Sequence, residues 1–113
     1  QPQSAGQALR KYLAEHGFAI EREALAKDGH FFYTVLRAKK GSMPPLSPGQ
    51  QYASPQLLRE GGPLLGPYLA RIETALAGTV LGLQKADEPE KLRYYGTALA
   101  EIREMRKQHE NCS

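Results

Sequence analysis

The sequence contains no tryptophan and only one cysteine, Cys112, which lies next to the C-terminus. An intrachain disulfide and a cysteine metal cluster are therefore both excluded. No apolar run approaches the roughly 20 residues that a membrane-spanning helix needs, and the N-terminus lacks the basic and then apolar layout of a secretory signal. From these absences we expect a cytoplasmic protein with no membrane association and no bound metal.

The net charge is small and is compatible with several kinds of partner. The 113 residues include 15 Lys and Arg and 12 Asp and Glu, which gives a net charge of +3 and a pI of about 9.1. This mild basic bias permits contact with a polyanion without requiring it. Apolar residues make up 41% and charged residues 24%, as in ordinary globular proteins. The length predicts one domain with a modest core.

The first part of the chain is predicted to be a helix that leads into a strand. Ser4 is a candidate helix cap, and Gly17 can adopt the left-handed conformation that ends a helix. The helix should bury the apolar residues that recur at spacings of three and four, which are Ala8, Leu9, Tyr12 and Leu13.

An Asp-Gly pair at Asp28-Gly29 predicts a tight turn between two antiparallel strands. The first strand begins at Phe18, and the charged residues at 21–23 predict a twist or bulge in it. The second strand, "HFFYTVLRA", is apolar on both faces, so we expect it to be covered on both sides. A lone hairpin cannot provide that cover. The chain is therefore expected either to be part of a bigger sheet or to pair its edge with another copy.

The C-terminal half is predicted to be a helical hairpin. Residues 42–55 form a proline-rich connection without periodicity, and Ser54-Pro55 offers the start of a short helical turn. A long helix is predicted over about 63–84, and Asp87 resembles the cap of a last helix. The loop between them is so short that the helices must be antiparallel. Their shared seam is predicted to contain Leu65, Leu69, Ile72, Leu76, Leu83, Leu92, Tyr95, Leu99, Ile102 and Met105.

Four stretches follow one another along the chain: "QPQ", "LRKYLAEHGFAI", "KDGHFFYTVLRA" and "SPQLLREGGPLLGPYLARIETALAGTVLGL". In this order they resemble the C-terminal half of the bacterial tRNA (adenine-22-N1)-methyltransferases. The resemblance implies an α+β fragment. Residues 1–41 would be a helix and an antiparallel β-hairpin from the end of a Rossmann-like methyltransferase sheet. Residues 42–62 would be a linker with a short helix, and 63–113 an antiparallel, coiled-coil-like helical hairpin.

The resemblance also implies a function. The parent would be an S-adenosylmethionine-dependent transferase that methylates N1 of an adenine in tRNA, and this chain, which begins at Gln1, would be its C-terminal portion. The sequence holds no GxGxxG-type loop. We therefore expect the cofactor site to lie upstream, and the chain alone to bind no S-adenosylmethionine and to be inactive. Gln1, Pro2 and Gln3 stand where the family has a Gln-Pro-Asn turn beside the target base, which makes them the candidate catalytic-site residues.

Binding of tRNA would require cations that contact phosphates. The principal candidates are Arg10, Lys11, Lys39, Lys40, Arg59, Arg71 and Arg93, followed by Arg103, Arg106 and Lys107. Tyr94 is a candidate to stack on an RNA base, because it points away from the helical seam. His16 and His30 lie at the end of a helix and beside a turn, where structural roles are expected.

Two other functions are compatible with the same residues. The chain would be a non-catalytic interaction module if the helical hairpin or the exposed edge of the strand pair mediated self-association. It would be an RNA-binding accessory domain if the basic residues bound RNA without any chemistry. An upstream glycine-rich strand-loop-helix would favour the methyltransferase, and a start codon just before Gln1 would favour the module.

Overall fold

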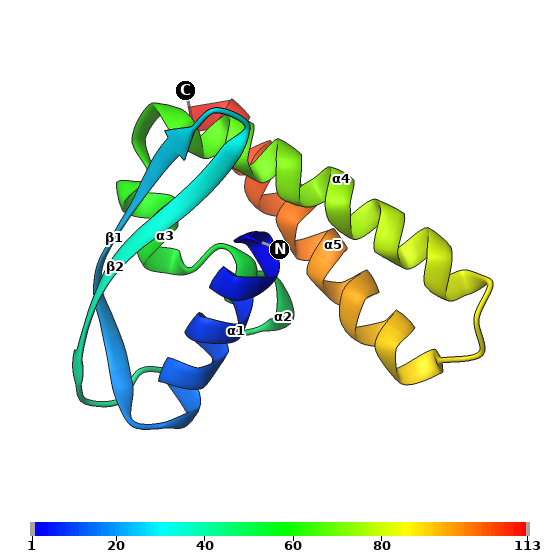
Figure 1. The fold of residues 1–113 in the computed structure, drawn as a ribbon, viewed down its shortest axis with the longest axis horizontal. Coiled ribbons are helices and arrows are strands. Elements are labelled where there is room, and N and C mark those ends of the chain that lie inside the picture. Colours follow the sequence, from blue (N-terminus) through cyan, green and yellow to red (C-terminus); the bar gives the residue numbers. More distant parts are fainter. Residues whose placement is uncertain (1, 113) are drawn as a thin grey trace.

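The computed structural model describes residues 2–112, which form an α+β fold (Figure 1). Its elements in chain order are α1 (Pro2–Glu15), β1 (Phe18–Asp28), β2 (Phe31–Lys40), α2 (Pro48–Tyr52), α3 (Pro55–Glu60), a 3-10 helix (Gly62–Leu64), α4 (Leu65–Gln84) and α5 (Pro89–Cys112). None of these helices is long and apolar enough to cross a membrane over the residues that the structure describes.

The two strands form the antiparallel hairpin that the Asp-Gly pair predicted. Asp28 pairs with Phe31, so the turn consists of Gly29 and His30, and Gly29 has a φ of 62°. Such a positive φ costs glycine little, because glycine has no Cβ. The register shifts between Ile20 and Arg22, which confirms the expected bulge. Gly17, with a φ of 78°, follows the end of α1 as predicted.

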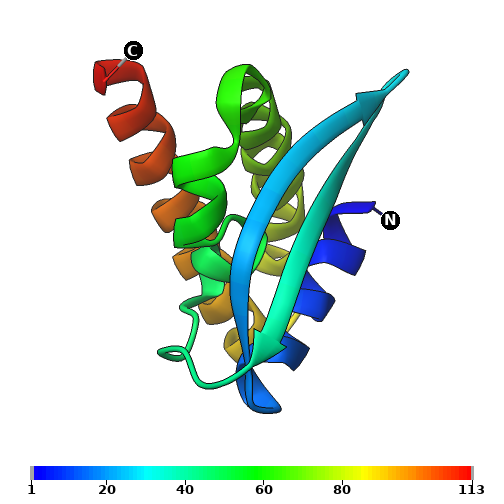
Figure 2. The same cartoon turned by 90° about the vertical axis from the view of Figure 1, so that its left-hand side faces the viewer.

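The hairpin is covered on one face only. In Figure 2 the strands lie in front of α1 and α4, and none of the elements formed by residues 2–112 lies over their outer face. Phe32 is buried on the inner face, whereas Phe31, Tyr33 and Val35 are 53%, 46% and 65% exposed on the outer face. The prediction that the second strand is apolar on both faces is therefore correct, but the described residues cover only one of them.

Helix α1 corrects two predictions. It begins at Pro2, so Ser4 lies inside the helix and is not its cap. Of the four apolar positions that were expected to face inward only Leu13 is buried, and Leu9 and Tyr12 are 45% and 51% exposed. The inward position is occupied instead by Arg10, because a buried carboxylate on β1 binds its guanidinium.

Helix α2 lies within the connection that was predicted to be irregular. Ser47 precedes Pro48, and its backbone N–H donates to the Gln50 side chain at 3.0 Å, as in a capping box. The N–H of Gly49 donates to Glu101 Oε1 at 2.7 Å, and a Cβ at Gly49 would lie 2.5 Å from the Cβ of Glu101. This close packing on α5 requires glycine and stabilises a helix of only five residues.

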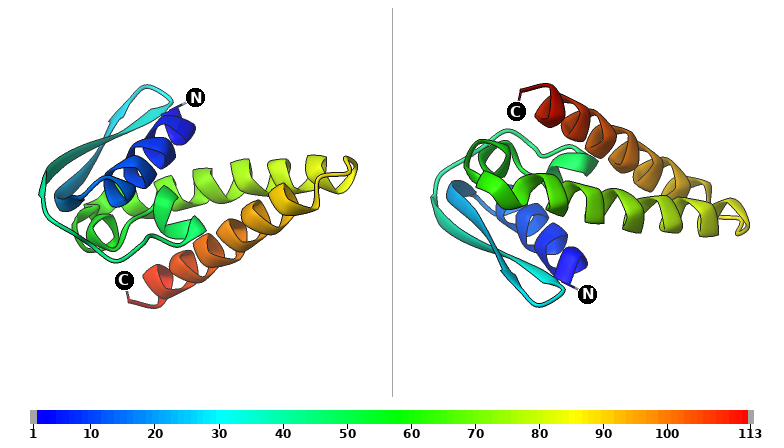
Figure 3. Two further views of the ribbon diagram at one scale, coloured as in Figure 1. Left: turned by 90° about the horizontal axis from the view of Figure 1, so that it is seen from below. Right: turned by 90° about the horizontal axis from the view of Figure 1, so that it is seen from above.

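Helices α4 and α5 form the expected antiparallel pair. They are joined by the loop at 85–88 and spread apart toward their other ends, where α2 packs against α5 (Figure 3). The structure begins α4 at Leu65, after a 3-10 turn, and begins α5 at Pro89, so Glu88 and not Asp87 precedes the last helix.

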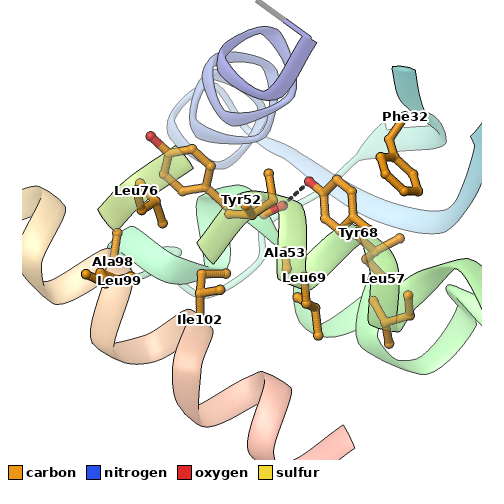
Figure 4. Close-up of a cluster of buried hydrophobic side chains, with 12 residues drawn as sticks. Phe32, Tyr52, Ala53, Leu57, Tyr68, Leu69, Leu76, Ala98, Leu99 and Ile102 are labelled. Carbon is orange, nitrogen blue, oxygen red and sulfur yellow. Dashed lines mark hydrogen bonds between the residues drawn. The ribbon is translucent and has the colours of Figure 1, made fainter. Parts of the chain in front are cut away.

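The core lies between this helical pair, the short helices and the inner face of the hairpin (Figure 4). Six of the predicted seam residues are buried in it: Leu65, Leu69, Ile72, Leu76, Leu99 and Ile102. Phe32 from β2 and Tyr52 from α2 join the same cluster, in which Tyr68 donates to the carbonyl of Tyr52 at 2.6 Å. The hairpin and the helical pair therefore share one core.

The carboxylates of Glu60 and Glu73 should make the stability of the fold depend on pH. Bonds from Gln56, from the backbone N–H of Glu23 and from Arg22 lower the pKa of Glu60, and Arg106 and Arg103 lower that of Glu73. A carboxyl group whose pKa is lower in the folded state stabilises the fold above its unfolded pKa and loses that contribution as pH falls through its folded pKa.

We therefore expect the thermal midpoint to decrease as the pH is lowered from neutral through the carboxyl range. The Glu73→Gln variant should have a lower midpoint at neutral pH and a shallower decrease. The exposed Glu15 provides a control, because its change to Gln should leave the profile as it is. An unchanged profile in Glu73→Gln, measured by circular dichroism, would contradict the role of this carboxylate.

Candidate nucleic-acid interface and buried polar junction

The three residues predicted to lie beside the target base stand at the start of α1. Gln1 lies outside the described residues, and Pro2 and Gln3 form the first turn of the helix. The structure therefore places the backbone of Pro2 and Gln3 at the N-terminal end of α1, and the roles of all three stay a prediction.

Arg10 is fully buried and is the centre of a polar junction. Its Nε and Nη2 donate to Glu23 Oε2 at 2.9 and 2.6 Å, and its Nη1 donates to the backbone carbonyls of Gln51 and Tyr52 at 2.9 Å each. The Glu23 side chain is equally buried. Helices α1 and α2 and strand β1 are thus joined by one ion pair from which water is excluded. A guanidinium in this position cannot contact an RNA phosphate, so Arg10 is excluded from the candidate RNA contacts.

Ser54 extends the junction to α3. Its hydroxyl donates to Glu23 Oε1, and its oxygen accepts the N–H of Leu57 at 3.1 Å as the N-cap of α3. This cap was predicted from the Ser54-Pro55 pair. The backbone N–H of Glu23 in turn donates to Glu60 Oε1 at 3.0 Å. Every polar side-chain atom of this buried group has a partner among the described residues.

A second polar contact joins α1 and α2 to α5. Gln7 Nε2 donates to Gln51 Oε1 at 2.8 Å and contacts the Tyr94 hydroxyl at 2.9 Å, and the Tyr94 hydroxyl also donates to Gln51. Burial raises the pKa of Tyr94, so its hydroxyl stays protonated as a donor. Tyr94 is therefore part of an interhelical contact, and the prediction of an exposed ring for RNA stacking is wrong.

The other cations predicted to contact RNA differ in their exposure to solvent and in their bonds to neighbouring residues. Lys11, Lys39, Lys40, Arg59 and Arg93 are exposed, although Lys39 lies 3.8 Å from Glu21. Arg71 is half-buried, donates to the His30 carbonyl at 2.6 Å and lies 5.1 Å from the Phe32 ring.

The basic residues of the helical pair are balanced by carboxylates. Arg103 and Arg106 both bind Glu73 across the seam between α4 and α5, and Lys91 binds Glu88. Residues 63–113 contain seven Lys and Arg and seven Asp and Glu, whereas residues 1–62 contain eight and five. The whole net positive charge therefore belongs to residues 1–62, where α1 and the hairpin carry it and the short helices are neutral.

Two of the hollows on this part of the surface adjoin each other. The proline hollow, of about 260 Å³, is lined by residues that include Ile20, Met43, Pro44, Leu46 and Arg59. The lysine hollow, also of about 260 Å³, is lined by Lys11, Ala14, Glu15, Pro45, Leu46 and Gln51. Pro45 and Leu46 line both and form a ridge between them.

His16 has a structural contact at the end of α1. His16 stacks on Tyr12 with ring centroids 3.9 Å apart, and its Nδ1 lies 2.8 Å from the Tyr12 carbonyl. Within residues 2–112, no three His, Cys, Asp or Glu side chains gather as metal ligands would.

Sequence reasoning missed the junction residues Glu23, Gln51 and Ser54 as a group. A signal was present in the charged residues at 21–23, which interrupt a strand and were interpreted only as a bulge. Arg10, the partner of Glu23, was interpreted as a surface cation. The spacing of residues along a helix does not show whether an arginine finds a buried carboxylate on another element.

Comparisons with known proteins agree on one family. The model of the tRNA (adenine(22)-N(1))-methyltransferase family matches residues 1–104. Two structures of Streptococcus pneumoniae Sp1610, assigned as a tRNA (m1A22) methyltransferase, have a similar fold. One, a complex with S-adenosyl-L-methionine, has a TM-score of 0.67 and 23% identity over 93% of this chain. The other has a TM-score of 0.66 and 24% identity over 89%. The chain spans only 44% and 45% of those two chains. No curated protein gives a significant match.

Proposed function

Because this chain belongs to the tRNA (adenine(22)-N(1))-methyltransferase family, we propose that it is the C-terminal portion of an S-adenosylmethionine-dependent enzyme that methylates N1 of an adenine in tRNA. The observation that carries the proposal is the match of the family model to residues 1–104. It confirms the resemblance that the order of the sequence motifs predicted.

We further propose that the hairpin is the end of a larger, Rossmann-like sheet. Among the described residues each strand pairs only with the other, so one edge of each is open to a further strand, and the outer face is open to another layer. The outer face of β2 exposes Phe31, Tyr33 and Val35 to solvent, and α1 exposes Leu9 and Tyr12. Apolar residues that gather on one side of a sheet usually belong against another layer. The remaining length of the Sp1610 chains is more than enough to supply that layer.

S-adenosylmethionine is proposed as the cofactor of the longer protein, with no cofactor site in this chain. The sequence has no glycine-rich loop. The longer protein would supply that loop from the part of its chain that precedes Gln1. No chemical step is assigned to the residues of this chain.

The substrate is proposed to be tRNA in the cytoplasm, and the chain would contribute phosphate contacts through its exposed cations. The candidates that remain after the burial of Arg10 include Lys11, Lys39, Lys40 and Arg59, with Arg71 and Arg93 on the helical pair. Gln1, Pro2 and Gln3 are proposed to lie beside the target base, where the amide side chains would orient the edge of the adenine.

The proposal predicts activity for the longer protein and none for this chain. An unmodified tRNA transcript should accept a methyl group from S-adenosylmethionine only when the longer gene product is present. A transcript with guanine at position 22 is the matched control and should not be methylated. Calorimetry should detect binding of S-adenosylmethionine to the longer protein and none to the chain. Methylation by the chain alone, or micromolar cofactor binding to it, would contradict the division of roles.

The exposed face of the hairpin also favours a second candidate, a non-catalytic module that self-associates through this face or through the helical pair. It predicts a dimer in sedimentation experiments at micromolar concentration and no methylation by any longer form. A monomer whose longer form methylates tRNA would exclude it.

A further inference from the structure

The distribution of charge indicates where RNA would contact this chain. Residues 63–113 are neutral, and their arginines at 103 and 106 are neutralised by Glu73. Residues 1–62 hold the whole positive excess although their most central cation, Arg10, is buried against Glu23. An RNA backbone is attracted to excess positive charge. Residues 1–62, which include Lys11 of α1 and Arg59 of α3, therefore fit an RNA strand better than the helical pair does.

Two exposed cations of this region lie on either side of the ridge formed by Pro45 and Leu46. Arg59 lines the proline hollow and Lys11 lines the lysine hollow. The Arg59 guanidinium donates one bond, from Nη2 to Gln56 at 2.7 Å, which leaves most of its N–H groups directed to solvent. A guanidinium with free N–H groups can bind a phosphate through two parallel bonds.

The carboxylates near the two cations do not neutralise them equally. Glu15 lines the lysine hollow beside Lys11, whereas the described residues around the proline hollow include no carboxylate. Glu60 follows Arg59 in the chain but is bound to Arg22 and Gln56. Arg59 is therefore the stronger anion contact of the pair.

The walls of the proline hollow are mostly apolar, with polar groups from Gln50, Ser54 and Gln56, and its size suits a single base. Ile20, Met43 and Leu46 line it together with three prolines, and its volume is about 260 Å³. A flat base can place its face against such walls, and unpaired nucleotides are the parts of RNA whose bases are free to do so.

We propose that the proline hollow holds one unpaired base of an RNA strand, with Arg59 on the adjoining phosphate and Lys11 on a phosphate across the ridge. This inference rests on the proposed RNA substrate and deepens it, since it assigns the contact to loop 43–46 and not to the helical pair.

The first experiment compares two double variants with equal loss of charge. Lys11→Gln/Arg59→Gln removes the proposed contacts, and Lys85→Gln/Lys91→Gln removes two exposed lysines at the tip of the helical pair. Binding of a fluorescent, unmodified tRNA transcript is measured by anisotropy at several salt concentrations. The slope of log Kd against log salt should fall by about 2 in the first variant and remain unchanged in the second.

The second experiment tests whether the proline hollow binds a base. An adenine decamer should bind at least about fivefold more tightly than an abasic strand of equal length. Leu46→Gln, which makes one wall polar at similar volume, should reduce that preference without changing the salt slope. Equal affinity for the two strands would contradict the proposal that the proline hollow holds a base.

The outcomes separate this inference from the proposed function. If the wild-type chain and the longer protein both fail to bind tRNA, the proposed substrate and this inference are both wrong. If the wild type binds but the two double variants weaken binding equally, or only the variant at the tip does, the proposed function stands and the contact surface assigned here is wrong.

Discussion

Replacing Arg10 with alanine is expected to destabilise the fold by about 3–5 kcal/mol, because it leaves the buried Glu23 carboxylate without its countercharge. The same change removes the donor to the buried Gln51 carbonyl and one of the two donors to the Tyr52 carbonyl, which keeps the Tyr68 hydroxyl. A small domain is stable by roughly 5–15 kcal/mol, so the variant should unfold at much lower urea concentration. Urea titration followed by circular dichroism measures the change.

A second ion pair, with the same nitrogen–oxygen distance but exposed to solvent, provides a matched control for the Arg10–Glu23 pair. Arg22 and Glu60 also form an ion pair with a nitrogen–oxygen distance of 2.6 Å, but the Arg22 side chain is 64% exposed. Water screens such a pair, so Arg22→Ala should change the urea midpoint far less than Arg10→Ala. In the Arg10→Ala/Glu23→Ala double variant, the loss should be smaller than the sum of the two single losses. Additive losses, or equal effects in Arg10→Ala and Arg22→Ala, would show that burial of this pair contributes nothing special.

Val35→Glu is expected to have opposite consequences in the chain alone and in the longer protein. Val35 is 65% exposed, lies opposite Ala24 and is two positions from the Arg22 and Arg37 pair. In the chain alone the glutamate should stay hydrated near these cations, with a change in stability within about 0.5 kcal/mol. In the longer protein, the proposed second layer would cover this position, and an ionised carboxylate buried there costs several kcal/mol.

The measurement is thermal unfolding of both forms together with methylation by the longer one. Loss of activity and a large decrease in midpoint are expected only for the longer protein. Gln84→Glu, at the exposed end of α4, adds the same charge away from the sheet and should be tolerated in both forms. If the longer protein tolerates Val35→Glu as well as the chain does, the outer face of the hairpin is open there, and the larger-sheet proposal is wrong.

Local signals explain which parts of the fold were predictable. The hairpin turn depends on an Asp-Gly pair, the end of α1 on Gly17, and the start of α3 on Ser54 followed by proline. In each case a few adjacent residues decide the backbone conformation. The helical seam was also predictable, because apolar residues at steps of three and four bury one face of any helix that packs on another.

Helix α2 and the inward face of α1 were not predictable in this way. The five residues of α2 are too few to be stable by propensity, and they depend on Glu101 of α5 to bind the N–H of Gly49. For α1, periodicity placed Leu9 and Tyr12 inside and Arg10 outside. The structure reverses this, because the partners of Arg10 are Glu23 and two carbonyls that lie 41 and 42 residues farther along the chain.

By itself the sequence determined the hairpin, the helical pair and the family, since each rests on short-range patterns or on the order of motifs. Only the tertiary structure decided which cations are available to a partner. Whether an arginine is a core residue or a surface contact depends on the groups that surround its guanidinium. For Arg10 those groups come from β1 and α2, whereas Arg59 bonds only to the neighbouring Gln56 among the described residues and is exposed. Burial of Arg10 and exposure of Arg59 place the proposed RNA surface around loop 43–46, between α1 and α3, and not on the helical pair.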